Sequence, residues 1–440
     1  MLGLNENRGE ALHDISLETI TRRMKAYYDP VIHSDEIRAL HPGLVTNAAS
    51  FDAGKTRLRL QRDSKFQEGN LRRFVFKPFD VRWAYIERSA NLWNRVRPDL
   101  LNHASRPNHF ILARRNVPKF PDGSTLFACT HLADQHVLHT DAYFIPLRLC
   151  VQGEKQDQGT TRSMVFSVPD SSNDNWKPNL SIQARAYLKK LGVGNPDRDP
   201  EAAKLTWMHV LAIGYSSAYL VENADGIRQD WPRIPLPKAK KLLLESAALG
   251  EQIANILDTE SPVEGVTGGN LRSELKSLAT PARTDAGNLK DAELALTAGW
   301  GHAGQAGVTM PGQGKLIERD YSNAEREAIA SGAKPLGLSV EQMFSLLGPK
   351  TCDIYLNDVA YWANVPAKVW DYTIGGYQVI KKWLSYREEK ILGRALTKEE
   401  VRYVQEMVRR IAAILLLGPA LDASYRAVKA DTFPWPSGKS

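Results

Sequence analysis

Apolar side chains alternate on both sides of a proline in the stretch FVFKPFDVRWAY, residues 74–85. The two phenylalanines before Pro78 share one face of an extended segment, and Val81, Trp83 and Tyr85 share one face after it. A proline cannot donate its backbone N–H to a β-ladder, so a bulge or a sheet edge is expected at Pro78. Aromatic residues at a period of two favour burial. The stretch therefore predicts two strands whose apolar faces belong to a core.

Positive charge is concentrated around this stretch. Residues 54–119 hold four lysines and twelve arginines against five acidic residues, a net charge of +11, so the other residues sum to −4 within the total of +7. Because a guanidinium group binds two phosphate oxygens at once, an arginine-rich segment favours a nucleic-acid backbone as its ligand. A surface of solvated ion pairs is the alternative. The candidate DNA-binding residues are Arg57, Arg59, Arg62, Arg72, Arg73, Arg82, Arg95, Arg97, Arg106, Arg114 and Arg115.

Their neighbours in the sequence suggest different roles for these arginines. Arg72 and Arg73 precede a predicted strand and are expected to hold phosphates. Arg95, Arg97 and Arg106 lie in turn-rich sequence, and loops on a rigid sheet can reach base edges in a groove. Asp80 and Arg82 project to one side of their strand and are expected to pair with each other.

Hydrophobic periodicity predicts an α+β fold, with a mixed β-rich domain that also contains helices, followed by a small helical C-terminal subdomain. The expected regions are a helical lead-in (1–53), a region that begins with the basic segment (54–258, with a candidate insertion at 152–203), a loop-rich connection with short strands (259–335) and the helical subdomain (336–440). Strands are predicted at 57–60, 110–114, 126–130, 144–149 and 353–356. Helices are predicted at 17–28, 181–191, 206–223, 238–258, 379–384 and 401–417, the last ending at Gly418-Pro419.

Cysteine usage and hydropathy indicate the compartment. Cys129, Cys150 and Cys352 are too few and too scattered for a disulfide framework, which favours a reducing cytoplasm. The N-terminus is acidic early and has no apolar core, so a signal peptide is not expected. The longest apolar run, 411–417, is too short to span a bilayer, and no membrane partner is expected.

Two short motifs resemble ligand sites without meeting their requirements. Cys129-x-His131-x4-His136-x2-His139 alternates like a strand and lacks the two-plus-two spacing of a zinc site. The sequence AGKT at 53–56 ends like a phosphate loop, but the first glycine of that motif is replaced by alanine and no apolar strand precedes it. We therefore expect no metal and no cofactor in this chain.

Catalytic motifs are equally sparse. Asp371, Glu388 and Lys390 have the residue types of a metal-dependent nuclease core, but that core needs the glutamate and lysine on a strand, and here both fall in a helical pattern. The chain contains no Pro-Pro dipeptide. Methylation of an exocyclic base amine needs an Asp/Asn-Pro-Pro-aromatic loop, so that chemistry is not expected in this chain.

Four sequence blocks in the same order resemble one family. They are FDVRW at 79–83 with Arg97-Pro98 downstream, WPRIPLP at 231–237, GWG at 299–301 with TMPGQGK at 309–315, and VWDYTIGGYQVIKKWL at 369–384 continuing to Leu392-Gly393-Arg394. Over about 70–430 the chain is similar to the C-terminal, target-recognition (specificity) region of type ISP restriction–modification enzymes and related adenine-specific DNA methyltransferases.

The resemblance implies that residues 54–258 form a mixed β-rich DNA target-recognition region. It also implies that binding and catalysis belong to different parts of the enzyme. In that family this region follows an S-adenosylmethionine-binding methyltransferase core, with a nuclease and in some members a helicase-type motor upstream. The present chain would then be a sequence-specific DNA-binding part with no catalytic residues of its own, acting in phage defence. Its partners would be double-stranded DNA and a methyltransferase subunit or upstream domain, in some members with a nuclease. S-adenosylmethionine would bind to that partner. A self-contained nuclease, or an RNA-binding or structural remnant, are the alternative functions.

Overall fold

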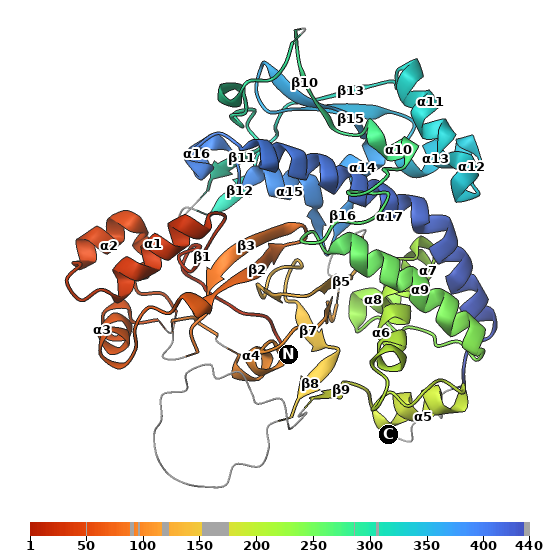
Figure 1. Cartoon of the computed structure of the whole chain (residues 1–440), viewed down its shortest axis with the longest axis horizontal. Coiled ribbons are helices and arrows are strands. Elements are labelled where there is room, and N and C mark those ends of the chain that lie inside the picture. Colours follow the sequence, from red (N-terminus) through yellow and green to blue (C-terminus); the bar gives the residue numbers. More distant parts are fainter. Residues whose placement is uncertain are drawn as a thin grey trace.

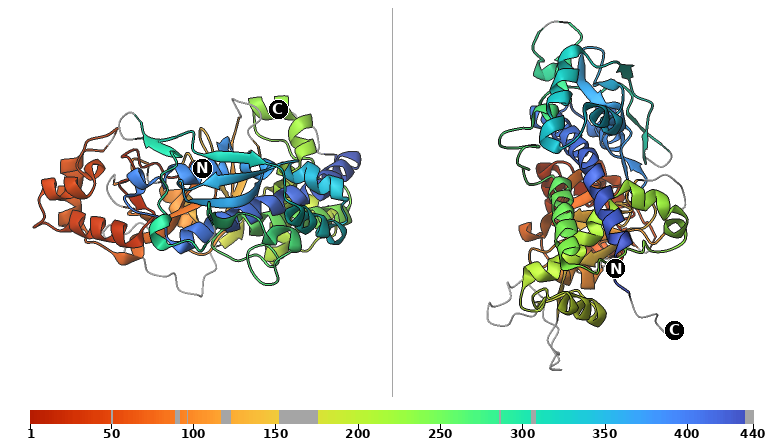
Figure 2. Two further views of the ribbon diagram at one scale, coloured as in Figure 1. Left: turned by 90° about the horizontal axis from the view of Figure 1, so that it is seen from above. Right: turned by 90° about the vertical axis from the view of Figure 1, so that its right-hand side faces the viewer.

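The computed structural model describes residues 1–49, 51–88, 92–95, 97–116, 123–151, 176–285, 287–304 and 308–434 (Figure 1). Lys119 and residues 152–175 of the candidate insertion lie outside these ranges. The described residues form the predicted α+β fold, with several small sheets rather than one large one. Helices α1–α3 (within residues 17–63) lie at one end of the molecule and α11–α13 (within residues 323–347) at the other, in both Figure 1 and the left view of Figure 2.

The first 178 residues contribute most of the small strands. The predicted helix at 17–28 is confirmed to the residue. The helices of this part are α1 (Leu17–Tyr28), α2 (Ser34–Leu40), α3 (Ala53–Asp63) and α4 (Pro98–His103), with 3-10 turns η1 (Pro42–Leu44) and η2 (Glu68–Asn70). The strands are β1 (His13–Asp14), β2 (Leu71–Lys77), β3 (Asp80–Tyr85), β4 (Phe110–Ala113), β5 (Leu126–Cys129), β6 (Leu132–Ala133), β7 (Tyr143–Pro146), β8 (Arg148–Cys150) and β9 (Trp176–Pro178).

The strand predicted at 57–60 is wrong, because these residues belong to helix α3. Asp52 caps this helix by accepting a hydrogen bond from the Lys55 N–H at 3.0 Å. Alternate leucines and arginines suggest period two over four residues. The buried set Ala53, Thr56, Arg57 and Leu60 has the spacing of one helical face.

The predicted strands around Pro78 are confirmed as a hairpin. Strands β2 and β3 pair antiparallel in a four-stranded sheet of order β1-β3-β2-β6, with a register shift between Val75 and Lys77. Pro78 and Phe79 form the two-residue turn. A second sheet has the order β5-β4-β7, and β8 pairs with β9.

Helices fill the middle of the chain: α5 (Ile182–Lys190), α6 (Pro200–Gly214), α7 (Ser217–Glu222), α8 (Ala224–Gln229) and α9 (Lys240–Leu257). The single helix predicted over 206–223 is wrong, since it breaks at Tyr215. Ser216 begins α7 by accepting a hydrogen bond from the Tyr219 N–H at 3.2 Å. A serine at this position favours a helix start over a helix interior.

The C-terminal part is not purely helical. Its helices are α10 (Ser273–Lys276), α11 (Asn323–Ser331), α12 (Ala333–Leu336), α13 (Val340–Leu347), α14 (Ala367–Trp370), α15 (Val379–Ser385), α16 (Glu389–Leu392) and α17 (Lys398–Ala430), with the 3-10 turn η3 (Asp291–Glu293). Its strands are β10 (Thr280–Arg283), β11 (Gly301–Ala303), β12 (Thr309–Pro311), β13 (Leu316–Arg319), β14 (Thr351–Tyr355), β15 (Ala360–Pro366), β16 (Thr373–Ile374) and β17 (Tyr377–Gln378). One sheet has the order β10-β15-β14-β13, so it crosses the boundary expected at residue 335.

Helix α17 is longer than the sequence predicts. Its capping box at Thr397 and Glu400 is confirmed, but the helix runs through Pro419 to Ala430. The turns beyond the proline are held by tertiary contacts, because Asp422 accepts hydrogen bonds from the Ser216 hydroxyl (2.7 Å) and the Ala218 N–H (3.0 Å). By length and composition α17 alone among the described helices could cross a membrane. Here it packs against α9 and α13, and its apolar residues belong to the core.

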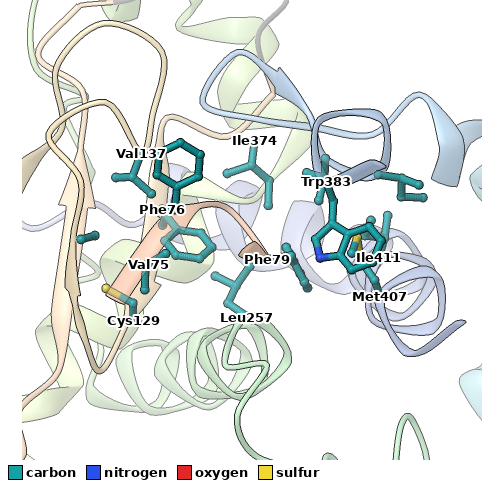
Figure 3. Close-up of a cluster of buried hydrophobic side chains, with 14 of the residues drawn as sticks. Val75, Phe76, Phe79, Cys129, Val137, Leu257, Ile374, Trp383, Met407 and Ile411 are labelled. Carbon is teal, nitrogen blue, oxygen red and sulfur yellow. The ribbon is translucent and has the colours of Figure 1, made fainter. Parts of the chain in front are cut away.

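The tip of the β2–β3 hairpin is an anchor in this core. Phe79 is 1% exposed and has a backbone φ of 60°, a conformation that is strained for a bulky residue. Figure 3 shows its side chain between Leu257 of α9 and the side chains of Trp383 and Met407. The Tyr403 hydroxyl of α17 donates to the Phe79 carbonyl at 2.7 Å. The hairpin therefore ties the N-terminal sheet to the C-terminal helices.

Candidate nucleic-acid interface

Three of the predicted DNA-binding arginines lie in the interior. Arg57, Arg82 and Arg114 are at most 9% exposed. Arg57 donates to the backbone carbonyls of Tyr27 and Ile32 at 3.0 and 2.6 Å, so it fastens α3 to the end of α1. A phosphate cannot reach these guanidinium groups in this conformation. Their assignment as DNA contacts is therefore corrected to a structural role.

The predicted pair of Asp80 and Arg82 is confirmed and is part of a larger buried network. Asp80 accepts from Arg82 at 3.0 Å and from Arg387 at 2.8 Å. Arg82 also pairs with Glu10 of the N-terminal loop at 2.5 Å. Burial opposes ionisation of Asp80, but the two guanidinium groups outweigh it and hold the pKa of this carboxyl well below its usual value. The Asp-x-Arg of the hairpin thus joins three parts of the chain.

The other predicted arginines are at least partly accessible to solvent. They differ in burial and in their contacts with carboxylates and aromatic rings. Arg59, Arg62, Arg95 and Arg115 are exposed. Arg73 is partly buried, forms a bidentate pair with Glu260 at 2.7 Å and lies over the Trp83 ring. Arg72, Arg97 and Arg106 are of intermediate exposure. The basic segment therefore presents fewer available cations than its charge indicates.

A cleft of about 620 Å³ opens beside the β2–β3 hairpin. Its walls are the loop from Asn5 to Ile15, the end of β2 with Lys77, and residues Val308 and Thr309 of the β11–β12 hairpin. The loop is strained, since Asn7 and Glu10 have φ values of 55° and 72°. Sequence patterns do not indicate this cleft, because a positive φ at Asn or Glu leaves no periodic signal.

A cluster of lysines and tyrosines lies next to the cleft, where α15 meets β2. Lys77 is buried and donates to the His136 carbonyl at 2.8 Å. The Lys382 ammonium lies over the rings of Tyr386 (4.7 Å) and Tyr377 (5.7 Å). Burial, reinforced by the charge of Lys77, lowers the pKa of Lys382 to about 8. No sequence pattern indicates that Lys382 belongs to such a cluster.

The lowered pKa makes Lys382 a destabilising residue at neutral pH. Below pH 8 the folded protein carries this charge at a cost that the unfolded chain, with an ordinary lysine pKa, does not have. Stability should therefore rise as the pH increases from about 8 toward the unfolded value of about 10.4. We expect Lys382→Met to raise the free energy of unfolding by about 2 kcal/mol at pH 7, with a smaller gain at about pH 10.

Denaturant unfolding of both proteins at the two pH values measures this effect. The matched control is Lys381→Met, one residue away on the same helix. An equal gain from Lys382→Met at both pH values would show that its charge is not penalised. A residue retained at a cost to stability is a candidate for a functional role.

The alternative nuclease residues are not arranged for metal binding. Glu388 is buried, and its carboxylate accepts hydrogen bonds from the backbone N–H groups of Gly299 (3.0 Å) and Trp300 (2.9 Å). Asp371 and Lys390 are exposed on other elements. Within the described ranges, no three His, Cys, Asp or Glu side chains converge as a metal site would require. Glu388 therefore supports a loop.

Comparison with known proteins identifies the family. A model of the Type ISP C-terminal specificity domain matches residues 1–412. No curated protein matches the sequence.

Solved structures share the fold at low identity. The cryoEM structure of a DrdV–DNA complex has a TM-score of 0.53 at 14% identity, covering 100% of this chain and 36% of that chain. The ATP-dependent Type ISP restriction–modification enzyme LlaBIII bound to DNA has a TM-score of 0.54 at 13% identity, covering 96% and 23%. A nuclease-deletion mutant of the Type ISP enzyme LlaGI, in complex with a DNA substrate mimic, has a TM-score of 0.51 at 13% identity, covering 96% and 27%.

The present chain thus spans between 23% and 36% of the length of these three proteins. Because the family model matches residues 1–412 of 440, the chain belongs to the Type ISP C-terminal specificity domain family.

Proposed function

We propose that this chain is the sequence-specific DNA-binding part of a restriction–modification-type adenine DNA methyltransferase. The observation that carries the proposal is the specificity-domain match over residues 1–412. The three solved relatives, which share the fold, are described as bound to DNA or to a DNA substrate mimic. The exposed cations on and near the basic segment supply the charge that a phosphate backbone requires.

In this proposal, another domain or subunit carries out catalysis. The chain lacks the Asp/Asn-Pro-Pro-aromatic loop, since its sequence contains no Pro-Pro dipeptide. We therefore propose that S-adenosylmethionine and the target adenine are bound by a methyltransferase partner or upstream domain. The protein would act in the cytoplasm, where it selects the DNA site at which its partner acts.

Duplex binding should depend steeply on salt. With about six phosphate contacts, the logarithm of the association constant should fall with the logarithm of salt concentration with a slope of about −5. Replacing Arg59 or Arg62 by alanine should reduce the steepness of this slope by about one, because each guanidinium group neutralises one phosphate. Fluorescence anisotropy of labelled duplexes between low and moderate salt measures this slope.

A matched control separates specific from general charge effects. Lys334 is exposed on α12, at the end of the molecule opposite α3 (Figures 1 and 2). Lys334→Ala should leave the slope unchanged. A binding constant of the unmodified protein that does not vary with salt would contradict DNA binding through phosphates.

A further inference from the structure

The β11–β12 hairpin is firmly held at its base. Besides the two backbone hydrogen bonds that the Glu388 carboxylate accepts, the Trp300 indole N–H donates to the Tyr355 carbonyl at 2.8 Å, and this ring is fully buried. A Cβ at Gly301 would lie 2.0 Å from the Ser385 carbonyl oxygen, so the backbone contacts α15 directly. At Gly314, where φ is +71°, a Cβ would lie 2.1 Å from the Trp300 ring. The base therefore has little freedom to move.

The strands rising from this base present apolar side chains to solvent. Val308 is 59% exposed and Met310 is 47% exposed. Met310 lies on β12, and Val308 directly precedes this strand, where its carbonyl accepts a hydrogen bond from the Gly304 N–H at 2.7 Å. Because the two residues are two positions apart in extended chain, their side chains lie on the same face. The sequence from Gly299 to Gly314 contains no Asp, Glu, Lys or Arg. Single exposed apolar residues are common, but here two lie together on a rigidly anchored and uncharged element.

Cations flank this hairpin. Helix α15 contacts both β11 and β12, and α16 contacts β11, as Figure 1 shows at the upper left. These two helices carry Lys381, Lys382 and Lys390. Among the described residues, none of the three has a carboxylate within ion-pair distance. Lys382 is the residue whose charge is costly to the fold.

This combination of exposed apolar side chains and flanking cations suits a nucleic acid better than a protein as the ligand of the β11–β12 hairpin. A stable protein interface covers about 800 Å² on each partner, which far exceeds what two side chains on a narrow hairpin can supply. Proteins that deform DNA insert a few apolar side chains, methionine among them, between base steps and hold the adjacent phosphates with cations. Val308 and Thr309 also form one wall of the cleft beside the β2–β3 hairpin, so DNA at the β11–β12 hairpin would lie at the edge of this cleft.

We propose that the β11–β12 hairpin unstacks a base step of bound duplex DNA by inserting Val308 and Met310, while Lys381, Lys382 and Lys390 hold the neighbouring phosphates. This inference rests on the proposed DNA-binding function and adds a mechanism to it. Unstacking by the specificity part would ease extraction of a base, which costs less from an already disturbed stack.

Permanganate footprinting tests the proposal, because permanganate oxidises thymines that are unstacked. Duplexes enriched from a random-sequence library by the full chain serve as targets. We expect the unmodified protein to render one or two thymines in the bound site hyper-reactive. The double variant Val308→Ala, Met310→Ala should lose this hyper-reactivity at least tenfold while keeping the salt slope of binding. Ile317→Ala, a comparably exposed residue on β13, is the matched control and should retain the hyper-reactivity.

The outcomes distinguish the wedge from DNA binding itself. A double variant that still produces hyper-reactive thymines, or an unmodified protein that binds without producing any in thymine-containing sites, overturns the wedge and leaves DNA binding intact. Failure of the unmodified protein to bind any duplex overturns the proposed function together with the wedge. Independently, each of Lys381→Ala, Lys382→Ala and Lys390→Ala should lower the salt slope by about one. Unchanged slopes in all three variants would remove the lysines from the proposal.

Discussion

Replacing Asp80 by alanine is expected to lower the free energy of unfolding by about 3–5 kcal/mol, the range for breaking a buried ion pair. Asp80 is 1% exposed and is shared by Arg82 and Arg387. Among the residues that the structure describes, its removal leaves Arg387 with no carboxylate at ion-pair distance and Arg82 with Glu10 alone. Urea unfolding measures the loss. The control is Asp225→Ala, since Asp225 is 91% exposed and lies 3.6 Å from Arg228; this change should stay within about 0.5 kcal/mol.

The loss of stability caused by Asp80→Ala should also depend on pH in a defined direction. Because the folded-state pKa of Asp80 is depressed, its contribution is complete above the unfolded value of about 3.9 and declines as the pH falls toward the folded value. The difference between the unmodified protein and Asp80→Ala should therefore be constant from about pH 8 to about pH 5 and should narrow below about pH 4. A deficit below about 1 kcal/mol at pH 7 would show that the network contributes little to stability.

Replacing Trp383 by alanine should be comparably damaging, at about 3–5 kcal/mol, because a large aromatic side chain leaves a cavity that the surroundings fill only in part. Trp383 is 3% exposed, its ring stacks on Tyr403 with centroids 5.8 Å apart, and the Arg387 guanidinium lies 3.7 Å from its centroid. It also supports the pocket that receives Phe79 (Figure 3). Thermal and urea unfolding both report the change.

Trp231→Ala is the matched comparison, since Trp231 is 37% exposed, and it should have a much smaller effect on stability. If Trp383→Ala unfolds like the unmodified protein but no longer binds duplex DNA, then Trp383 is a ligand contact and its assignment to the core is wrong.

Local sequence patterns predicted those parts of the fold whose partners are near in the chain. The aromatic residues on both sides of Pro78, helix α1 and the capping box of α17 all depend on spacing or on neighbours within a few residues. The early end predicted for α17 failed for the opposite reason. A proline inside a helix is unfavourable locally, but Asp422 gains hydrogen-bond partners from a segment about 200 residues earlier.

The sequence predicted the positive charge of the candidate site but not which of its cations are accessible on the surface. Composition counts arginines but does not say which of them find a partner elsewhere. Arg82 reaches Glu10, which is 72 residues away, and the carbonyl groups that bind Arg57 lie 25 to 30 residues before it. Conversely, the surroundings of Lys382 are only partly local. Tyr386 is four residues away in the chain, but the Tyr377 ring comes from β17, and the cations Lys77 and Arg82 come from β2 and β3. Only the three-dimensional arrangement distinguishes an available cation from a structural one.

The anchoring of the β2–β3 hairpin bears on how specificity could be exchanged between relatives. The hydrogen bond between Tyr403 and Phe79 joins residues 324 positions apart, and the one between Arg387 and Asp80 joins residues 307 apart. A chimaera with a crossover anywhere between these residues would take the hairpin tip from one parent and the residues that contact it from the other. Exchange of DNA specificity between relatives should therefore succeed when the whole segment from before Glu10 to beyond Tyr403 is exchanged. It should fail when only short segments from within this range are exchanged.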